Sequence, residues 1–128
     1  MLKFVFIAAG GALGAAARYG VSGWVQNVRP AMFPWGTLCV NAVGSFLMGA
    51  FLGISELAPV SSTTRLLLAV GFLGAFTTFS TYSLETLNLF RDKEVMLGLV
   101  NIGLNNSLSL LAVLAAYFLS RSLATLIT

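Results

Sequence analysis

Residues 74–83 read GAFTTFSTYS, a run with five Ser or Thr hydroxyls and three aromatic rings inside a chain that is otherwise strongly apolar. Glycine and hydroxyl-bearing residues are weak helix formers, and Ser and Thr side chains compete with the helical ladder for backbone hydrogen bonds. We therefore expect a break in a helix near Gly74 to Thr78. Whether water or lipid surrounds the chain determines how the freed backbone groups at this break can be satisfied. The amino-acid composition indicates which of the two it is.

The composition is typical of an integral membrane protein. Of the 128 residues, 58% are hydrophobic and 9% are charged, whereas an ordinary soluble domain carries about 25% charged residues. Too few polar side chains remain to cover a surface that faces water, so lipid is the expected solvent.

The composition also argues against several classes of function. Cys39 is the single cysteine and histidine is absent, which excludes an intrachain disulfide, a cysteine metal cluster and a histidine proton shuttle. The sequence has only four acidic residues: Asp92, Glu56, Glu85 and Glu94. Few carboxylates are therefore available to form a catalytic pair. The formal charge is +3 without any polybasic run, so neither an enzyme nor a nucleic-acid partner is expected.

Four stretches are long and apolar enough to cross a bilayer, which takes roughly 20 residues. They run from about Phe4 to Val25, from Gly36 to Ile54, from Leu66 to Phe90 and from Val95 to Leu119. The connections at 26–35, 55–65 and 91–94 are short, so residues 1–128 are expected to form a single four-helix transmembrane domain.

The first span has an alternative interpretation as a secretory signal, because Lys3 precedes an apolar run that ends in small residues. Cleavage would discard Gly10, Gly11 and Gly14. Glycines four residues apart let helix backbones approach closely in lipid, so we interpret this cluster as a packing face.

The loops carry almost no charge bias that would set an orientation in the membrane. Three basic residues lie on the side of both termini, and three or four lie on the other side. The first group is Lys3, Arg65 and Arg121, and the second is Arg29, Arg91 and Lys93, with Arg18 leaning the same way. Because loop charge sets orientation, such a chain is expected to insert both ways and to form an antiparallel dimer. A single orientation set by another feature remains open.

Two spans carry polar residues at i, i+4 and i+8, a spacing that places them on one helix face. They are Thr37, Asn41 and Ser45 on the second span, and Asn101, Asn105 and Ser109 on the fourth. Unsatisfied polar groups cost several kcal/mol in hydrocarbon, so such faces meet a partner, a cavity or a pore. For Asn41 the alternatives are an interhelical hydrogen bond and a donor to a passing solute. For the fourth span they are the wall of a polar pathway and a packed seam between subunits.

Two charged residues within the spans are further candidates. Arg18 lies near the end of the first span and is expected to snorkel toward the interface, with attraction of anions in a vestibule as the alternative. Glu85 is the only acid within a span and is a functional candidate for that reason. Its alternative is a salt bridge with Arg18 or Arg91.

The aromatic residues of the run recur at every third position. Phe76, Phe79 and Tyr82 are expected to share one helix face. Ring edges are electropositive and can contact an anion in an apolar setting. We interpret Phe76 as a packing residue.

The run resembles the signature of the small bacterial fluoride channel family (Fluc), in which Gly-Gly-Leu-Thr-Thr-Phe-Ser-Thr-Phe-Ser is followed two residues later by Glu. The matching positions are Gly74, Thr77, Thr78, Phe79, Ser80, Thr81, Ser83 and Glu85. The resemblance extends to Arg18, Gly36, Thr37, Leu38, Asn41 and Gly44, and to length and span count. The chain departs from the family pattern at Ala75 and Tyr82, and in the polar residues of its fourth span.

This resemblance implies an all-α membrane protein with four transmembrane helices per chain, the third broken mid-membrane, in an antiparallel dual-topology homodimer. It implies a structural Na+ at the dimer centre, held by the backbone carbonyls of Gly74 and Thr77 from both subunits. The expected location is the bacterial cytoplasmic (inner) membrane, where the chain would give passive fluoride efflux and protect the cell from fluoride.

The resemblance also assigns a fluoride pathway. Phe79 and Tyr82 would supply ring edges, and Asn41 would donate a hydrogen bond. The polar steps would be Ser80, Thr81, Asn101, Asn105 and Ser109, with Arg18, Thr37 and Glu85 as vestibule or secondary candidates.

Two other functions remain open at this level. One is a small dual-topology multidrug/proton antiporter, which requires a membrane-buried acid, and only Glu85 is available. The other is a noncatalytic structural membrane subunit, which would carry no ion flux.

Overall fold

The computed structural model describes residues 1–127 as an all-helical chain. Four helical segments are long and apolar enough to cross a membrane. The first is α1 (Leu2–Val28), the second is α2 (Trp35–Ser55), the third covers Ser62–Arg91, and the fourth is α6 (Val95–Ile127). Each predicted span lies inside one of these segments, so the prediction of four spans is confirmed.

The third segment is built from four pieces. They are α3 (Ser62–Thr64), the π-helical stretch η1 (Arg65–Leu73), α4 (Gly74–Phe76) and α5 (Phe79–Arg91). The segment begins before the predicted start because the Ser61 hydroxyl accepts a hydrogen bond from the Thr64 amide at 3.0 Å and caps the first turn.

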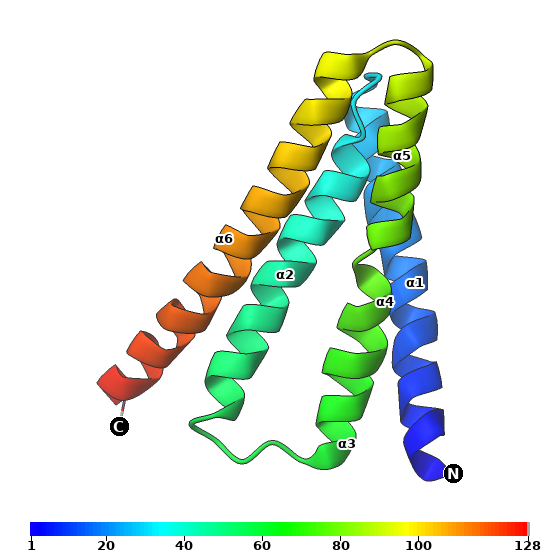
Figure 1. The fold of residues 1–128 in the computed structure, drawn as a ribbon. Helices are drawn as coiled ribbons and strands as arrows, with labels where there is room; N and C mark the ends of the chain where they lie inside the picture. The colour runs from blue at the N-terminus through cyan, green and yellow to red at the C-terminus, as the bar shows by residue number, and fades with distance from the viewer. Residues whose placement is uncertain (128) are drawn as a thin grey trace.

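The helices alternate in direction, so both termini lie at one end and the α1–α2 and α5–α6 connections lie at the other (Figure 1). Helix α6 packs along α2, and α1 packs along η1 and α4. The two pairs diverge toward the end with the termini, which gives the chain the outline of a wedge (Figure 1).

Glycines let the paired helices touch backbone to backbone. A Cβ on Gly10 would collide with the Leu67 carbonyl oxygen, and a Cβ on Gly14 with the Phe72 carbonyl oxygen, both in η1. The interpretation of this cluster as a packing face is therefore confirmed. Gly49 plays the same part between α2 and α6, because a Cβ there would collide with the Val113 carbonyl oxygen.

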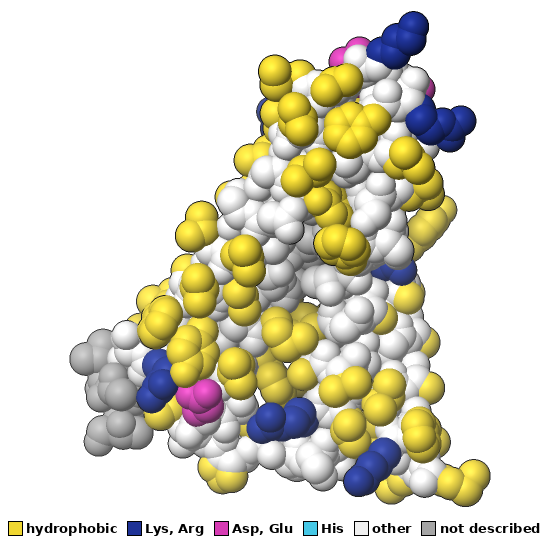
Figure 2. All heavy atoms as spheres, in the orientation of Figure 1, with side chains coloured by type: hydrophobic (Ala, Val, Ile, Leu, Met, Phe, Trp, Pro, Cys, Tyr) yellow, Lys and Arg dark blue, Asp and Glu magenta, His cyan; other side chains and the backbone are white. Residues whose placement is uncertain are grey.

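The outside of the molecule is largely apolar. Figure 2 shows hydrophobic side chains over most of one face, with the charged side chains of that face gathered mainly toward its two ends. Leu110 and Leu111 on α6 are 63% and 62% exposed. Such a surface suits hydrocarbon, because little of it offers water a hydrogen bond.

The helical ladder of the third segment stops at Thr77 and Thr78. Both residues are extended, with φ −86° and ψ 156° at Thr77 and φ −150° and ψ 118° at Thr78. Gly74 has helical dihedrals, so the glycine is not the residue that interrupts the ladder. The Thr78 hydroxyl accepts a hydrogen bond from the Thr81 amide at 3.2 Å and so starts α5 as an N-cap. We call Thr77 and Thr78 the link.

We predict that Gly49→Ala destabilises the detergent-solubilised protein by about 1–3 kcal/mol, because the new methyl group meets backbone atoms that cannot move aside. Gly20→Ala is the matched control, since a Cβ at Gly20 has no atom within 4 Å. Thermal unfolding compares the two variants. Equal midpoints would contradict the backbone contact between α2 and α6.

Candidate functional site

The link is held by a side chain from another helix. The Asn41 Oδ1 atom on α2 accepts a hydrogen bond from the Thr78 amide at 2.8 Å, and its Nδ2 atom donates to the Thr78 carbonyl at 3.1 Å. Gly44, one turn further along α2, leaves room for the link, because a Cβ there would collide with the Thr77 side chain. The Asn41 amide therefore supplies the acceptor that the Thr78 amide lacks in the backbone, and adds a hydrogen bond to the Thr78 carbonyl.

A chain of hydrogen bonds continues from Asn41 into α6 and α5. Asn41 Nδ2 donates to Asn105 Oδ1 at 2.9 Å, and Asn105 Nδ2 donates to Asn101 Oδ1 at 2.7 Å. Asn101 Nδ2 then donates to the Thr86 hydroxyl at 2.9 Å. The Thr86 hydroxyl in turn donates to the Tyr82 carbonyl at 2.8 Å. Asn101 is fully buried and Asn105 nearly so. The polar faces predicted on the second and fourth spans therefore meet within one chain as a packed network.

A cavity of about 270 Å³ lies beside this network, and we call it the aromatic cavity. It is lined by Asn41, Ser45, Thr77, Thr78, Phe79, Tyr82, Asn105, Asn106, Ser109 and Leu110. The rings of Phe79 and Tyr82 meet edge to face, with centroids 5.2 Å apart. Five residues of the predicted fluoride pathway are brought together here: Asn41, Phe79, Tyr82, Asn105 and Ser109.

The donors left free in the aromatic cavity are hydroxyls. Both amide hydrogens of Asn41 are already donated to Thr78 and Asn105. Within the described chain, the Ser45 and Ser109 hydroxyls have no hydrogen-bond partner. The Tyr82 hydroxyl accepts from Asn106 Nδ2 at 3.1 Å, which leaves its own proton available.

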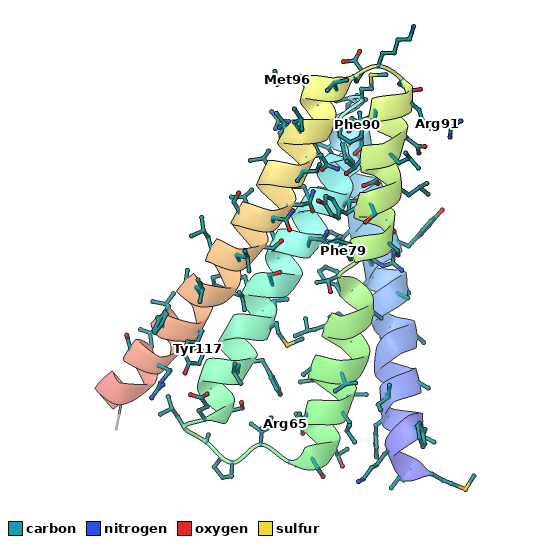
Figure 3. The ribbon with its side chains drawn as sticks, viewed as in Figure 1. Arg65, Phe79, Phe90, Arg91, Met96 and Tyr117 are labelled. Atoms are coloured by element: carbon teal, nitrogen blue, oxygen red, sulfur yellow. The ribbon has the colours of Figure 1, made fainter. Side chains whose placement is uncertain are left out.

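Phe79 is 74% exposed, and it lies about midway between Arg65 near one end of the chain and Arg91 near the other (Figure 3). Phe76 is buried and stacks on Phe72, with centroids 5.8 Å apart. The expectation that Phe76, Phe79 and Tyr82 share one helix face was therefore wrong, because the extended link separates Phe76 from the other two rings.

A second cavity of about 850 Å³ is also lined by Thr78, and we call it the polar cavity. Its lining includes Arg18, Thr37, Thr78, Thr81 and Glu85. It therefore holds all three of the predicted vestibule or secondary residues, together with Thr81 from the predicted fluoride pathway.

Arg18 does not extend toward the interface as the sequence suggested. Its Nε atom donates to the Ala75 carbonyl at 3.0 Å. In a continuous helix this carbonyl would accept from the Phe79 amide, and the extended link removes that donor. Arg18 thus donates a hydrogen bond to a carbonyl at the end of α4 that has no backbone partner.

Glu85 accepts a hydrogen bond from the Thr37 hydroxyl at 2.7 Å through Oε1. Its Oε2 atom is buried and has no hydrogen-bond partner within the described chain. No ion pair to Arg18 or Arg91 is present among residues 1–127. The carboxylate is therefore an acceptor with unused capacity at the wall of the polar cavity.

Thr78 is the residue that sequence reasoning left out of the candidate site. It lines both cavities, and its hydroxyl contacts Thr81 Oγ1 at 3.0 Å and Ser80 Oγ at 3.4 Å. Ser80 itself is exposed and lines neither cavity. A threonine directly before a new helical turn is a typical N-cap, and that signal was present in the sequence.

Comparison with known proteins identifies relatives over nearly the whole chain. A family model described as "CrcB-like protein, Camphor Resistance (CrcB)" matches residues 5–117. A protein of Hahella chejuensis named "Fluoride-specific ion channel FluC" is 49% identical over 118 residues, covering 91% of this chain and 93% of its own. Proteins of the same name from Parabacteroides distasonis and Thermus thermophilus are 41% and 53% identical, covering 99% and 73% of both chains respectively.

We predict that Asn105→Leu destabilises the protein by about 1–3 kcal/mol for each partner left unsatisfied, because Asn41 Nδ2 loses an acceptor and Asn101 Oδ1 loses a donor. Thermal unfolding in detergent measures the effect. Asn88→Leu is the control, since Asn88 is exposed and its side chain makes no hydrogen bond within the described chain. Equal midpoints would show that the network contributes no stability.

Proposed function

The chain belongs to the CrcB-like family, and from this membership we propose that it is a fluoride-selective ion channel in a bacterial membrane. Its helices fit a multi-pass location, because four segments are long and apolar enough to span a bilayer. The expected activity is passive efflux that protects the cell from fluoride. No catalytic step is involved.

The observation that carries this proposal is the aromatic cavity with its ring edges and free hydroxyls. Fluoride is small and strongly hydrated, so a selective pore must replace its water with donors that still let the ion leave. Tyr82, Ser45 and Ser109 offer neutral donors, and the rings of Phe79 and Tyr82 offer electropositive edges. Neutral donors favour release more than a lysine or arginine would.

We infer that the ion path runs from the polar cavity to the aromatic cavity past Thr78, which lines both. Arg18 attracts anions to the polar cavity, and Thr81 offers a hydroxyl there. Asn41 and Asn105 form part of the wall of the aromatic cavity, and Asn101 supports it from behind. The midway position of Phe79 between Arg65 and Arg91 supports a location of the link at membrane depth (Figure 3).

The proposal includes an antiparallel homodimer with dual topology. The nearly even division of basic residues between the two sides supports insertion in both orientations. The exposed ring of Phe79, next to the aromatic cavity, supports a second copy that covers this face.

A structural Na+ fits the carbonyls beside the link. The Thr78 amide, which would reach the Gly74 carbonyl in a continuous helix, donates to Asn41 instead. The Gly74 carbonyl thereby loses its helical donor, and Thr77 belongs to the extended link. Carbonyl oxygens suit a hard cation and add no negative charge that would repel fluoride. Bound Na+ would supply a fixed positive charge that holds the ends of the broken helix.

We predict that liposomes containing the purified protein release fluoride and retain chloride when an ion-selective electrode follows each efflux. Empty liposomes are the control for leakage. Equal release of both anions, or release of neither, would contradict a fluoride-selective channel. Uptake of a cationic substrate driven by a pH gradient would instead support an antiporter that uses Glu85.

The contribution of Tyr82 to the path predicts an ordered series of fluxes. Tyr82→Phe keeps the ring edge and loses the hydroxyl that accepts from Asn106, so substantial fluoride flux should remain. Tyr82→Ile loses the ring beside Phe79, and fluoride flux should fall by about tenfold or more. The same liposome assay measures all three proteins. Indistinguishable fluxes would restrict Tyr82 to a packing role.

A further inference from the structure

We propose that Asn41 is a positioning residue for the cation site, because its single hydrogen bond to the Thr78 amide produces both carbonyl ligands. The inference rests on the Na+ site under Proposed function and extends it to a side chain that would not touch the ion. Three features of the structure support it, and each involves the 2.8 Å contact between Asn41 Oδ1 and the Thr78 nitrogen.

The first feature concerns the Gly74 carbonyl. In an α-helix the carbonyl of residue i accepts from the amide of residue i+4, which for Gly74 is Thr78. The preceding pair is intact, since the Thr77 amide donates to the Leu73 carbonyl at 3.2 Å. The ladder therefore ends at the position where Asn41 takes the amide, and the Gly74 oxygen is the first one deprived of its donor by that contact.

The second feature concerns the Thr77 carbonyl. The Thr77 carbonyl and the Thr78 amide belong to one peptide group, and a planar trans peptide directs its C=O and N–H in opposite directions. Because the N–H of this group faces Asn41 on α2, the Thr77 oxygen faces away from Asn41. The same hydrogen bond that frees the first carbonyl therefore sets the direction of the second.

The third feature is that the side-chain amide of Asn41 cannot rotate by 180° without losing its hydrogen bonds. Its Nδ2 atom donates to the Thr78 carbonyl and to Asn105 Oδ1, so exchanging the two ends of the amide would break three hydrogen bonds. Asn105 is held in turn by Asn101. The two contacts to Thr78 keep Oδ1 toward the Thr78 amide even without Asn105, which adds a third contact, and the carbonyl directions at the link follow from this orientation.

The test compares the Na+ dependence of thermal stability for three variants and the parent in detergent. Na+ replaces N-methyl-D-glucamine at constant ionic strength, and the Na+ concentration at half-maximal stabilisation is the readout. Asn41→Leu removes the acceptor for the Thr78 amide. Asn41→Asp keeps an acceptor oxygen there. Asn105→Leu removes the neighbouring contact to Nδ2 and leaves the Oδ1 contact in place.

We expect Asn41→Leu to raise the Na+ midpoint about tenfold or more, the size expected when one buried hydrogen bond is lost. Asn41→Asp should have a midpoint at or below that of the parent, and Asn105→Leu should stay close to the parent. A parent-like midpoint in Asn41→Leu would overturn the inference while leaving the Na+ site intact. If Asn41→Leu does not fold, Asn41→Ala also removes the acceptor for the Thr78 amide, and a parent-like midpoint there would overturn the inference equally.

Two further outcomes distinguish the positioning role of Asn41 from the proposed Na+ site and from the proposed fluoride channel. A parent protein that shows no stabilisation by Na+ would overturn the Na+ site and the positioning role together, without bearing on fluoride flux. Absence of fluoride efflux from liposomes, with the expected order of Na+ midpoints retained, would overturn the channel and leave the role of Asn41 standing.

Discussion

The structure depends on satisfying the backbone groups of a helix that is interrupted at Thr77 and Thr78. An unpaired backbone group inside hydrocarbon costs several kcal/mol, so an interruption survives only where protein or a cavity serves the freed groups. Here Asn41 on α2 accepts the hydrogen bond of the freed Thr78 amide, and Arg18 on α1 donates to the freed Ala75 carbonyl. Two different helices thus hold the place at which the third segment changes from α4 to α5.

The same requirement explains the arrangement of the cavities. A polar network that stabilises the link has to lie next to it, so Asn105 and Asn101 occupy the buried face of α6. The hydroxyls that the network does not use, on Ser45 and Ser109, face the aromatic cavity. Support of the link and free hydrogen-bonding capacity are therefore divided between neighbouring residues of the same two helix faces: the amides mainly support the link, and the hydroxyls remain free to donate.

The sequence predicted the four spans, the glycine packing face and a polar face on each of two helices, because each depends on local spacing, but it did not predict that the two polar faces meet. It did not predict the direction of Arg18, since snorkelling is the usual choice near a helix end and the competing carbonyl of Ala75 lies 57 residues away. It also placed Phe76 with Phe79 and Tyr82, because helical spacing was extended through a link whose dihedrals are extended. Both errors arise from the interruption at the link, which ends the helical spacing after Phe76 and leaves the Ala75 carbonyl without its helical donor.

The central claim is that Asn41, and not Gly74, accepts the hydrogen bond of the Thr78 amide. Nuclear magnetic resonance of the isotope-labelled protein tests it directly through scalar coupling across the hydrogen bond. The account predicts a coupling between the Thr78 amide nitrogen and the side-chain carbonyl carbon of Asn41. A coupling between that nitrogen and the backbone carbonyl carbon of Gly74, as in an uninterrupted helix, would contradict it.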